Sequence, residues 1–397
     1  MRIYSPSFIA SAQGFTDSAN TRLRCKKIRI YPSVELGKIW RKWLAACRYC
    51  FNQAIAYQRP NKRTSLLKLR NIIMRSDLPE WVKETPCHIK QNAIFDAHRA
   101  YSASVDARFR SCRNLQQTIK FNNSNFSSGC WYPKLTKGLS FTASETLPEN
   151  CSAATQLTFS SCRWFAIVPE EMVVERKEKD GIIALEPGVR TFLTGFDGHR
   201  FVEFGYGDIG RITRLCQYLD DLISRMSKVC RKQRRRMRQA AHRMRIKIRH
   251  LIDEAHKQIV CYLTDNYRVI FLPTFETSQM VAKARRKIRS KTVRSMLAWA
   301  HYRFELFLAQ KAEMTNTIVI TGSEAYTSKT CTKCGHIHQS LGGSKVFKCP
   351  SCGHTLPRDM NGALGVMLRA LRDTAFTVSD DGVAIAALSG NFPYCVA

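Results

Sequence analysis

The chain has 397 residues, and 63 Lys and Arg against 31 Asp and Glu give it a formal net charge of +32. Hydrophobic residues make up 44% of the sequence, which is enough for two or three packed domains and excludes a disordered basic tail. The cationic excess, with aromatic residues interleaved, favours a polyanion as partner and so indicates nucleic acid.

The chain also lacks the sequence features of a membrane or secreted protein. No run of 18 apolar residues occurs, and residues 1–15 contain no continuous apolar signal segment. We therefore expect a cytoplasmic protein without a membrane partner. The 16 cysteines would then be free thiols, apart from those that bind metal.

The N-terminal part of the chain predicts a β domain with a helical insertion. Residues 1–22 have no clear period and predict a flexible arm. Apolar and basic residues alternate in 23–33, as in a strand with one wet face, and short alternating runs return over 116–179. Between them, 34–115 carries apolar residues at helical spacing, which indicates core packing rather than a ligand site.

A composition shift at Asp180 opens a second domain. Three short strands joined by tight turns come first, then a helical stretch from about Gly210 to Asp265, and later strands and helices alternate. This order predicts a mixed sheet with helices on its faces, built from 180–325 and 355–372. The tail, 373–397, carries no clear signal.

The helical stretch of the second domain is strongly basic. Between Arg211 and Arg249 it holds 14 Lys or Arg against only Asp220 and Asp221. A solvated helical face is the usual explanation of a charge run, but this density favours contact with nucleic acid. Seven candidate contact residues are Arg231, Arg234, Arg235, Arg238, Arg285, Arg286 and Lys329; a plain loop lysine remains an equal interpretation of the last.

Four cysteines have the spacing of a metal site. They form a C-x2-C-x14-C-x2-C array within 326–354, a segment that we interpret as a zinc ribbon. Four soft thiolates in tetrahedral reach select Zn²⁺ and leave no position for water, so the ion would be structural. The predicted ligands are Cys331, Cys334, Cys349 and Cys352.

Three acidic residues are candidates for the chemistry. Glu186 follows the first strand of the second domain, Glu324 follows its last strand, and Asp359 precedes an apparent helix. Each acid alone is more readily explained as a surface residue or helix cap. Brought together at one sheet edge, they would bind Mg²⁺ or Mn²⁺, and two such ions support phosphodiester hydrolysis.

Several segments resemble one family. DGIIALEPGVRTF, LPTFETSQMV, SEAYTSKTCTKCG and CPSCGHTLPRDMNGA follow one another as in the split RuvC domain and zinc ribbon of the TnpB family, which is similar to the type V CRISPR effectors. WRKWLAACRYCFNQAI and LPEWVKETPCHIKQNAIFDAHRAY also resemble that family's helical region, so the likeness covers roughly 25–372.

The resemblance implies an RNA-guided DNA endonuclease of a transposable element, in the bacterial cytoplasm and associated with the nucleoid. Its fold would join a ribonuclease H-like RuvC domain and an inserted four-Cys zinc ribbon to a β-barrel-like wedge domain. Its partners would be a guide RNA from the transposon end and target double-stranded DNA, which the basic helices would contact through backbone and shape. A monomer is expected, with a dimer left open.

The chain departs from the family pattern at the acids. Family members typically have Asp where this chain has Glu186, and misplacing a carboxylate by about 1 Å can lower a rate about a hundredfold. The second acid is either Glu324, our preferred ligand, or Glu276. Leu364 and Gly365 stand where an Arg-Asn pair is common. A catalytically weakened RNA-guided DNA-binding protein and an accessory transposase therefore remain alternatives.

Overall fold

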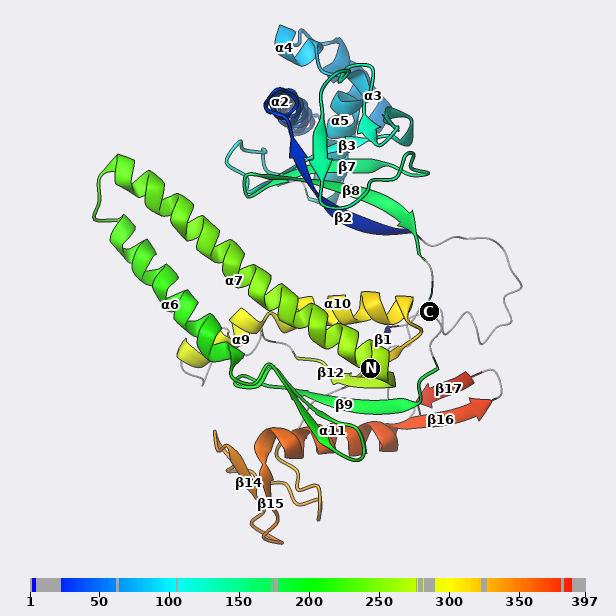
Figure 1. The fold of residues 1–397 in the computed structure, drawn as a ribbon, viewed down its shortest axis with the longest axis vertical. Helices are drawn as coiled ribbons and strands as arrows, with labels where there is room; N and C mark the ends of the chain where they lie inside the picture. Colours follow the sequence, from blue (N-terminus) through cyan, green and yellow to red (C-terminus); the bar gives the residue numbers. More distant parts are fainter. Residues whose placement is uncertain are drawn as a thin grey trace. The chain divides into compact units, whose positions relative to one another are not determined.

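A computed structural model describes 2–4, 23–61, 64–104, 106–172, 174, 178–275, 277, 281, 290–322, 327–379 and 382–387. The chain forms two compact units, one of Asn20–Met172 and the other of Val173–Ala397 together with Met1–Ala19 (Figure 1). In the described part of the chain, no helix is both long and apolar enough to cross a membrane.

The unit of Asn20–Met172 is built on a five-stranded antiparallel sheet in the order β3-β7-β8-β2-β6. Its strands are β2 (Leu23–Pro32), β3 (Gln116–Phe121), β6 (Phe141–Ala143), β7 (Thr155–Ser160) and β8 (Arg163–Glu171), with the pair β4 (Phe126–Ser127) and β5 (Cys130–Trp131) beside it. Among the described residues β3 and β6 do not pair with each other, so the expected barrel-like closure is corrected to an open sheet.

Helices of the predicted insertion pack into the core of this sheet. They are α2 (Val34–Gln58), α3 (Leu66–Arg75), α4 (Glu80–Lys83) and α5 (Cys87–Ala103), followed by the 3-10 turn η1 (Asn123–Asn125). The hydroxyl of Ser33 accepts a hydrogen bond from the Leu36 amide at 3.4 Å and so caps α2. Trp40 of α2 is buried edge-on against Trp131 and Trp164, which join the helix to the strands.

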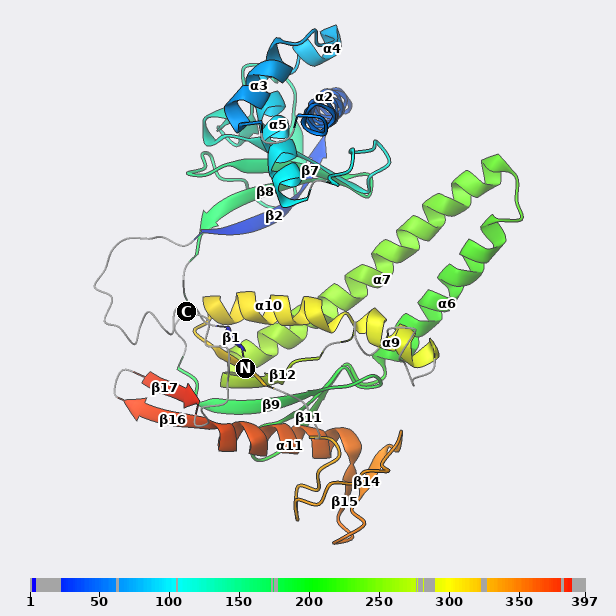
Figure 2. The same ribbon diagram turned by 180° about the vertical axis from the view of Figure 1, so that it is seen from behind.

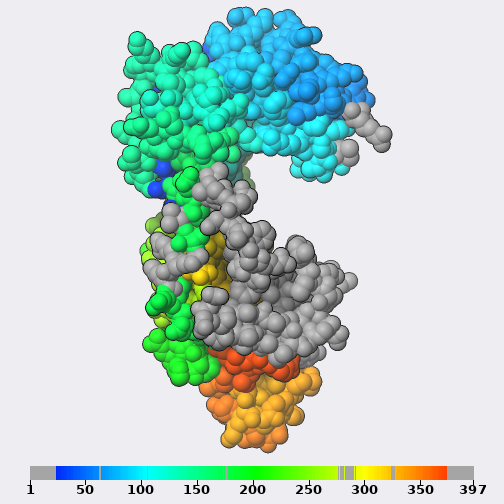
Figure 3. Space-filling model, turned by 90° about the vertical axis from the view of Figure 1, so that its right-hand side faces the viewer, coloured from blue at the N-terminus to red at the C-terminus, as the bar shows by residue number. Residues whose placement is uncertain are grey.

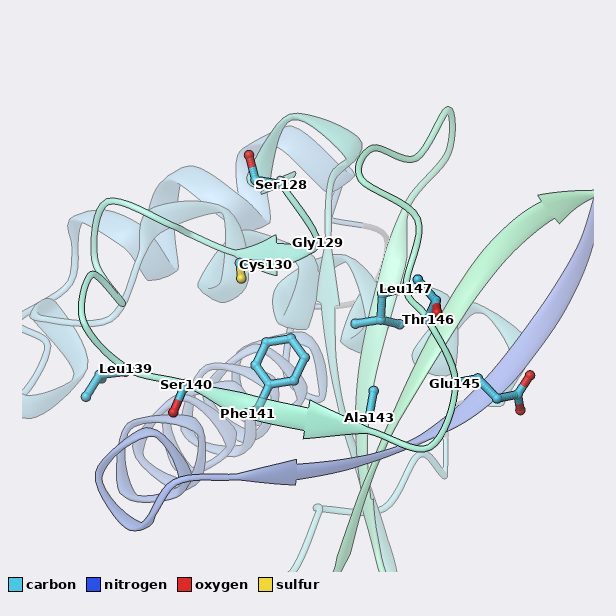
Figure 4. Close-up of a pocket in the computed structure, with 10 residues that line it drawn as sticks. All are labelled: Ser128, Gly129, Cys130, Leu139, Ser140, Phe141, Ala143, Glu145, Thr146 and Leu147. Carbon is cyan, nitrogen blue, oxygen red and sulfur yellow. The ribbon is translucent and has the colours of Figure 1, made fainter.

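An open pocket of about 510 Å³ lies beside β5 and β6 (Figure 4). Cys130, Phe141 and Leu147 line it, and its single charged wall residue, Glu145, pairs with Lys26 at 2.7 Å. Burial raises the pKa of the Cys130 thiol, which keeps it protonated and unreactive at neutral pH. The walls therefore offer no convergent set of catalytic groups.

The second unit contains a six-stranded mixed sheet in the order β1-β13-β12-β9-β10-β11, in which β9, β12 and β13 run parallel. Its strands are β1 (Arg2–Tyr4), β9 (Gly181–Pro187), β10 (Leu193–Phe196), β11 (Phe201–Phe204), β12 (Tyr267–Pro273) and β13 (Ile318–Gly322). Its helices are α6 (Asp208–Met226), α7 (Arg231–Asn266), α9 (Ser290–Trp299), α10 (His301–Met314) and α11 (Arg358–Asp373).

The two faces of this sheet carry different helices. Ile183 and Leu185 of β9 point to the core shared with α7 and α10, whereas Ala184 packs with Val366 and Met367 of α11. Figures 1 and 2 show α11 on one side of β9 and α7 with α10 on the other. The alternation along β9 therefore decides which of its side chains face α11.

Two features, at the predicted arm and in 291–314, differ from the sequence-based expectation, and two others add detail that the sequence did not provide. Arg2–Tyr4 of the predicted arm forms an edge strand that pairs with β13. The long basic stretch is the helix pair α6 and α7, and the expected helix of 291–314 is interrupted at Ala300, whose φ of 51° is left-handed. In the tail, β16 (Thr374–Ser379) and β17 (Gly382–Ala387) form a hairpin.

A small ribbon, β14 (Val346–Lys348) paired with β15 (Thr355–Pro357), precedes α11 directly. Figure 3 shows this segment lying against the surface of α11. A ligand bound to the ribbon would therefore lie close in the chain to the first turn of α11.

Candidate active site and metal centre

Glu186 lies near the end of β9 on the face that α11 covers. It shares that face with Ile182 and Ala184, both in the α11 core, because alternate residues of a strand point the same way. A Cβ atom placed on Gly362 of α11 would lie only 2.7 Å from Cδ of Glu186. The carboxylate of Glu186 is thus packed directly against the backbone of α11.

Asp359 occupies the first turn of α11, one helical turn before Gly362. Its Oδ2 lies 3.7 Å from the position of a Cβ on Gly188, two residues after Glu186. Burial raises the pKa of Asp359, the charge of Glu203 adds to this, and Arg358 and Arg190 oppose it. The structure therefore brings two of the three predicted acids to the same contact between β9 and α11.

The remaining predicted acids, Glu324 and Glu276, lie outside the described residues. The strands before them run parallel to β9: β12 lies between β9 and β13, and Pro273 pairs with Gly322. Carboxyl ends of parallel strands meet at one sheet edge, which is where ligands bind in open α/β sheets. The strands β12 and β13 thus end at the edge that carries Glu186.

Glu203 is an acid near this site that sequence reasoning missed. Thr194 of β10 pairs with Glu186 on one side and with Glu203 on the other, so the three residues form a row on one face. The hydroxyl of Thr191 donates to Oε1 of Glu203 at 3.2 Å. The sequence signal was the hairpin turn at Asp197. This turn fixes the pairing of β10 with β11 and so sets Glu203 opposite Thr194.

The turn that follows Glu186 is held by a side chain from a distant segment. Trp299 at the end of α9 donates from Nε1 to the carbonyl of Val189 at 3.1 Å. A Cβ on Gly188 would collide with the carbonyl of Thr191, so only glycine fits this turn. The position of the Glu186 carboxylate therefore depends on the junction of α9 and α10.

Two buried histidines support that junction. The ring of Phe192 stacks on His256 of α7 at 5.0 Å and on His301 at 4.8 Å between centroids. His256 Nε2 is 2.9 Å from the carbonyl of Trp299. Burial lowers the pKa of His256 to about 4 and that of His301 to about 3, so both rings are neutral at pH 7. The sequence analysis had assigned no role to either histidine.

A groove of about 420 Å³ lies beside the same turn. Arg190 and Arg214 are its charged lining residues, and Thr213, Thr292 and Ser295 add hydroxyl groups. Val189 also lines the groove, so it begins three residues after Glu186. Two guanidinium groups with hydroxyl donors suit the oxygens of a phosphate group.

The four predicted cysteine ligands converge in the ribbon. Their sulfur atoms all lie within 4.8 Å of one another, with Cys331 and Cys352 at 3.6 Å and Cys334 and Cys349 at 3.6 Å. A tetrahedral ion with metal–sulfur bonds of about 2.3 Å requires sulfur atoms about 3.8 Å apart. The sulfur positions therefore fit a four-coordinate metal, and within the described chain this is the one group of three or more such ligands.

Asn361 connects the ribbon to α11. This fully buried residue donates from Nδ2 to the carbonyl of Thr330 at 2.9 Å, and its Oδ1 accepts from the hydroxyl of Thr332 at 3.1 Å. Thr330 and Thr332 flank Cys331, and Asn361 lies two residues after Asp359. The metal centre and the acidic site thus share one hydrogen-bonded connection.

The predicted nucleic-acid contacts fall into four groups. Arg231, Arg235 and Arg238 are exposed on α7, as a contact surface requires. Arg234 instead donates to the carbonyls of Met226, Ser227 and Val229, which ties it to the connection between α6 and α7. Lys329 is half-buried at the ribbon, and Arg285 and Arg286 lie outside the described residues.

Comparisons with known proteins match this architecture. The family model described as Cas12f1-like, TNB domain, matches residues 301–366. A putative transposase of Paramecium bursaria Chlorella virus 1 is 27% identical, covering 89% of this chain and 88% of that protein. A TnpB-like protein of Acanthamoeba polyphaga mimivirus is 21% identical, with coverage of 87% and 73%.

Two further similarities extend over most of the chain. The putative RNA-guided DNA endonuclease InsQ of Escherichia coli (strain K12) is 26% identical, covering 87% of this chain and 92% of that protein. Among solved structures, the Cas12f1 chain of a Cas12f1-sgRNA-target DNA complex is 12% identical with a TM-score of 0.50, covering 87% of this chain and 99% of that chain. This structural likeness concerns the fold.

Proposed function

We propose that this chain, a TnpB-type protein by its resemblance to relatives along nearly its whole length, is an RNA-guided endonuclease that cuts DNA at a RuvC-like site. The observation that carries the proposal is the placement of Glu186 on the α11 face of β9, against the helix that bears Asp359. Carboxylates that face each other at the carboxyl edge of a mixed sheet suit the binding of divalent cations.

Glu186 and Asp359 would hold Mg²⁺ or Mn²⁺, with Glu324 as the proposed third ligand. Such ions, when bound, activate water and neutralise charge on the phosphodiester. The donor set fits them, because both residues offer hard carboxylate oxygens and the site around Asp359 is partly buried. The protein's own task is then to fix the two carboxylates, which the turn at Gly188 and the packing against α11 accomplish.

The substrate strand would reach the acids through the groove lined by Arg190 and Arg214. A phosphate bound there would lie beside the turn that follows Glu186, which places the neighbouring phosphodiester near the carboxylates. Guanidinium groups bind phosphate bidentately without reading base sequence. Phosphate binding without base readout suits an enzyme whose sequence specificity comes from its guide RNA.

The ribbon would bind Zn²⁺ through Cys331, Cys334, Cys349 and Cys352. Four thiolates complete its coordination, so we assign it a structural role. Through Asn361 the zinc would stabilise the first turn of α11 and hence the position of Asp359.

Guide RNA from the transposon end and target double-stranded DNA are the proposed partners. The exposed arginines of α7, Arg231, Arg235 and Arg238, would contact the phosphate backbone of the paired strands. The net charge of +32 supports the binding of a polyanion such as RNA or DNA. Arg285 and Arg286 and Lys329 remain proposed contacts.

A test is cleavage of a plasmid library with randomised bases beside the target, by protein co-expressed with its native flanking DNA. Cutting in Mg²⁺ by the wild type, lost on Asp359→Ala, is the expected result. Guided binding without cutting, with activity gained on Glu186→Asp, would instead support the weakened DNA-binding protein. Absence of both guided binding and cutting would contradict the proposal.

A further inference from the structure

Gly362 stands where a helix would ordinarily favour another residue. It lies in the interior of α11, where glycine is the least favourable residue after proline. Its φ is not among the positive values of the chain, so the backbone itself does not require glycine. The reason for glycine must therefore lie in what surrounds it.

The neighbour that excludes a side chain at this position is Glu186. A Cβ on Gly362 would lie 2.7 Å from Cδ, 2.9 Å from Oε1 and 3.0 Å from Cγ of Glu186. Cβ atoms essentially never make contacts shorter than 3.0 Å, so either the end of the Glu186 side chain or the helix would have to move. The backbone of β9 is held by pairing on both sides, so the movement would fall on the side chain of Glu186, whose Oε2 is shielded from solvent.

Gly365, one turn further along α11, provides a contrast. A Cβ there would lie 2.9 Å from the backbone carbonyl of Thr327, so that glycine lets a loop approach the helix. At Gly362 the atoms that would be displaced all belong to one side chain, and to its carboxylate end. Gly362 therefore acts specifically on Glu186.

We infer that Gly362 is a positioning residue whose missing Cβ provides the space that the longer side chain of Glu186 occupies. Members of the resembled family typically carry Asp at position 186, which is shorter by one methylene. With glycine opposite, the added methylene packs against the backbone of α11, and the carboxylate stays beside the turn that bears Asp359. Glu186 is then a matched ligand rather than a decayed one.

This inference rests on the proposed nuclease function for its catalytic consequence, but the pairing itself is a matter of packing. Two measurements separate them. The first is a double-mutant cycle in thermal unfolding, which needs no activity and compares Gly362→Ala in the wild type and in a Glu186→Asp background. Gly37→Ala in α2 is the control, because its Cβ would make only an ordinary 3.7 Å contact with Pro32.

In the wild type, Gly362→Ala should lower Tm by several degrees, because it overpacks the contact. In the Glu186→Asp background the same change should leave Tm unchanged or raise it, because the space is free and Ala favours the helix. The control should shift Tm equally in both backgrounds. Equal shifts for Gly362→Ala in both backgrounds, or misfolding that Glu186→Asp does not rescue, would overturn the pairing.

The second measurement is the single-turnover cleavage rate as a function of Mg²⁺ concentration. Gly362→Ala should lower the rate about a hundredfold and raise the Mg²⁺ needed for half-maximal cleavage, since a misplaced carboxylate weakens the metal site. The double variant should recover both. A rate loss without any change in the Mg²⁺ requirement would overturn the positioning role, whereas a wild type that never cuts would refute the nuclease function and leave the unfolding cycle to decide the pairing.

Discussion

Asn361 accepts a hydrogen bond from the hydroxyl of Thr332 at 3.1 Å, and this contact joins the four-cysteine ribbon to the helix that bears Asp359. The same side chain donates to the carbonyl of Thr330 at 2.9 Å and is fully buried. A buried amide with both of its ends engaged fixes orientation as well as distance. The metal centre is thus coupled to the acidic site by one residue.

Replacing this amide should loosen both sites. Asn361→Ala leaves the Thr330 carbonyl and the Thr332 hydroxyl without their partner, at a cost of about 1–3 kcal/mol in the free energy of unfolding. Thr332→Val, which removes only one of the two hydrogen bonds, should cost less. Urea unfolding of both variants measures this, and equal stability of wild type and Asn361→Ala would refute the coupling.

The ribbon cysteines predict one tightly bound metal per chain. Cys349→Ser should release it and lower cleavage strongly, because the ribbon then no longer supports the first turn of α11. Elemental analysis of the purified protein should give one zinc for the wild type and none for the variant. Cys162→Ser, at an exposed cysteine of the other unit, is the control and should keep the metal.

The sequence predicted this centre because its information is local. Two C-x2-C pairs place their sulfur atoms within single turns, and the structure gathers all four within 4.8 Å. The three parallel strands could also be predicted from the sequence, since short apolar runs bounded by turns mark β9, β12 and β13. Features of this kind need no knowledge of the tertiary fold.

Other features depend on contacts that no local pattern records. The break at Ala300 follows Trp299, whose ring reaches the carbonyl of Val189, 110 residues earlier in the chain. Pairing of Arg2–Tyr4 with β13 joins the N-terminal residues of the second unit to a strand far along the chain. The fit of Gly362 to Glu186 likewise appears only when α11 is placed on β9.

Acid should destabilise the second unit through its buried histidines. The pKa of His256 is lowered to about 4 and that of His301 to about 3, whereas an unfolded chain has histidines near 6.5. As pH falls below 6.5 the unfolded state binds protons that the folded state does not, so stability falls by about 1.4 kcal/mol per pH unit for each ring. Asp253 and Arg303 face His256 with opposite effects, and His256 faces His301.

Unfolding in urea between pH 6.5 and 4 measures this slope. His301→Phe should reduce it by about one proton equivalent, whereas His199→Gln, at an exposed turn residue, should leave it unchanged. Identical slopes for wild type and His301→Phe would show that this ring is not the source of the acid sensitivity.

The arginines of α7 should separate into two classes. Arg235→Ala and Arg238→Ala remove exposed cations, so each should weaken RNA and DNA binding. Each should also reduce the slope of log K against log salt concentration by about 1, the value of one phosphate contact. Arg234→Ala removes three hydrogen bonds to the connection between α6 and α7 and should mainly lower Tm. Binding isotherms over a salt series with thermal unfolding distinguish the classes, and an unchanged salt slope for Arg235→Ala would contradict the contact.

We propose that Glu186 and Asp359 together form the cutting site. Single-turnover cleavage of a matched target in Mg²⁺ by the guide-loaded wild type and by Asp359→Asn, a change that keeps the shape of the side chain and removes its charge, tests this site. We predict guide-dependent cutting by the wild type and a loss of at least about 10³-fold in the variant, with target binding retained. Cutting by Asp359→Asn at the wild-type rate would contradict the account.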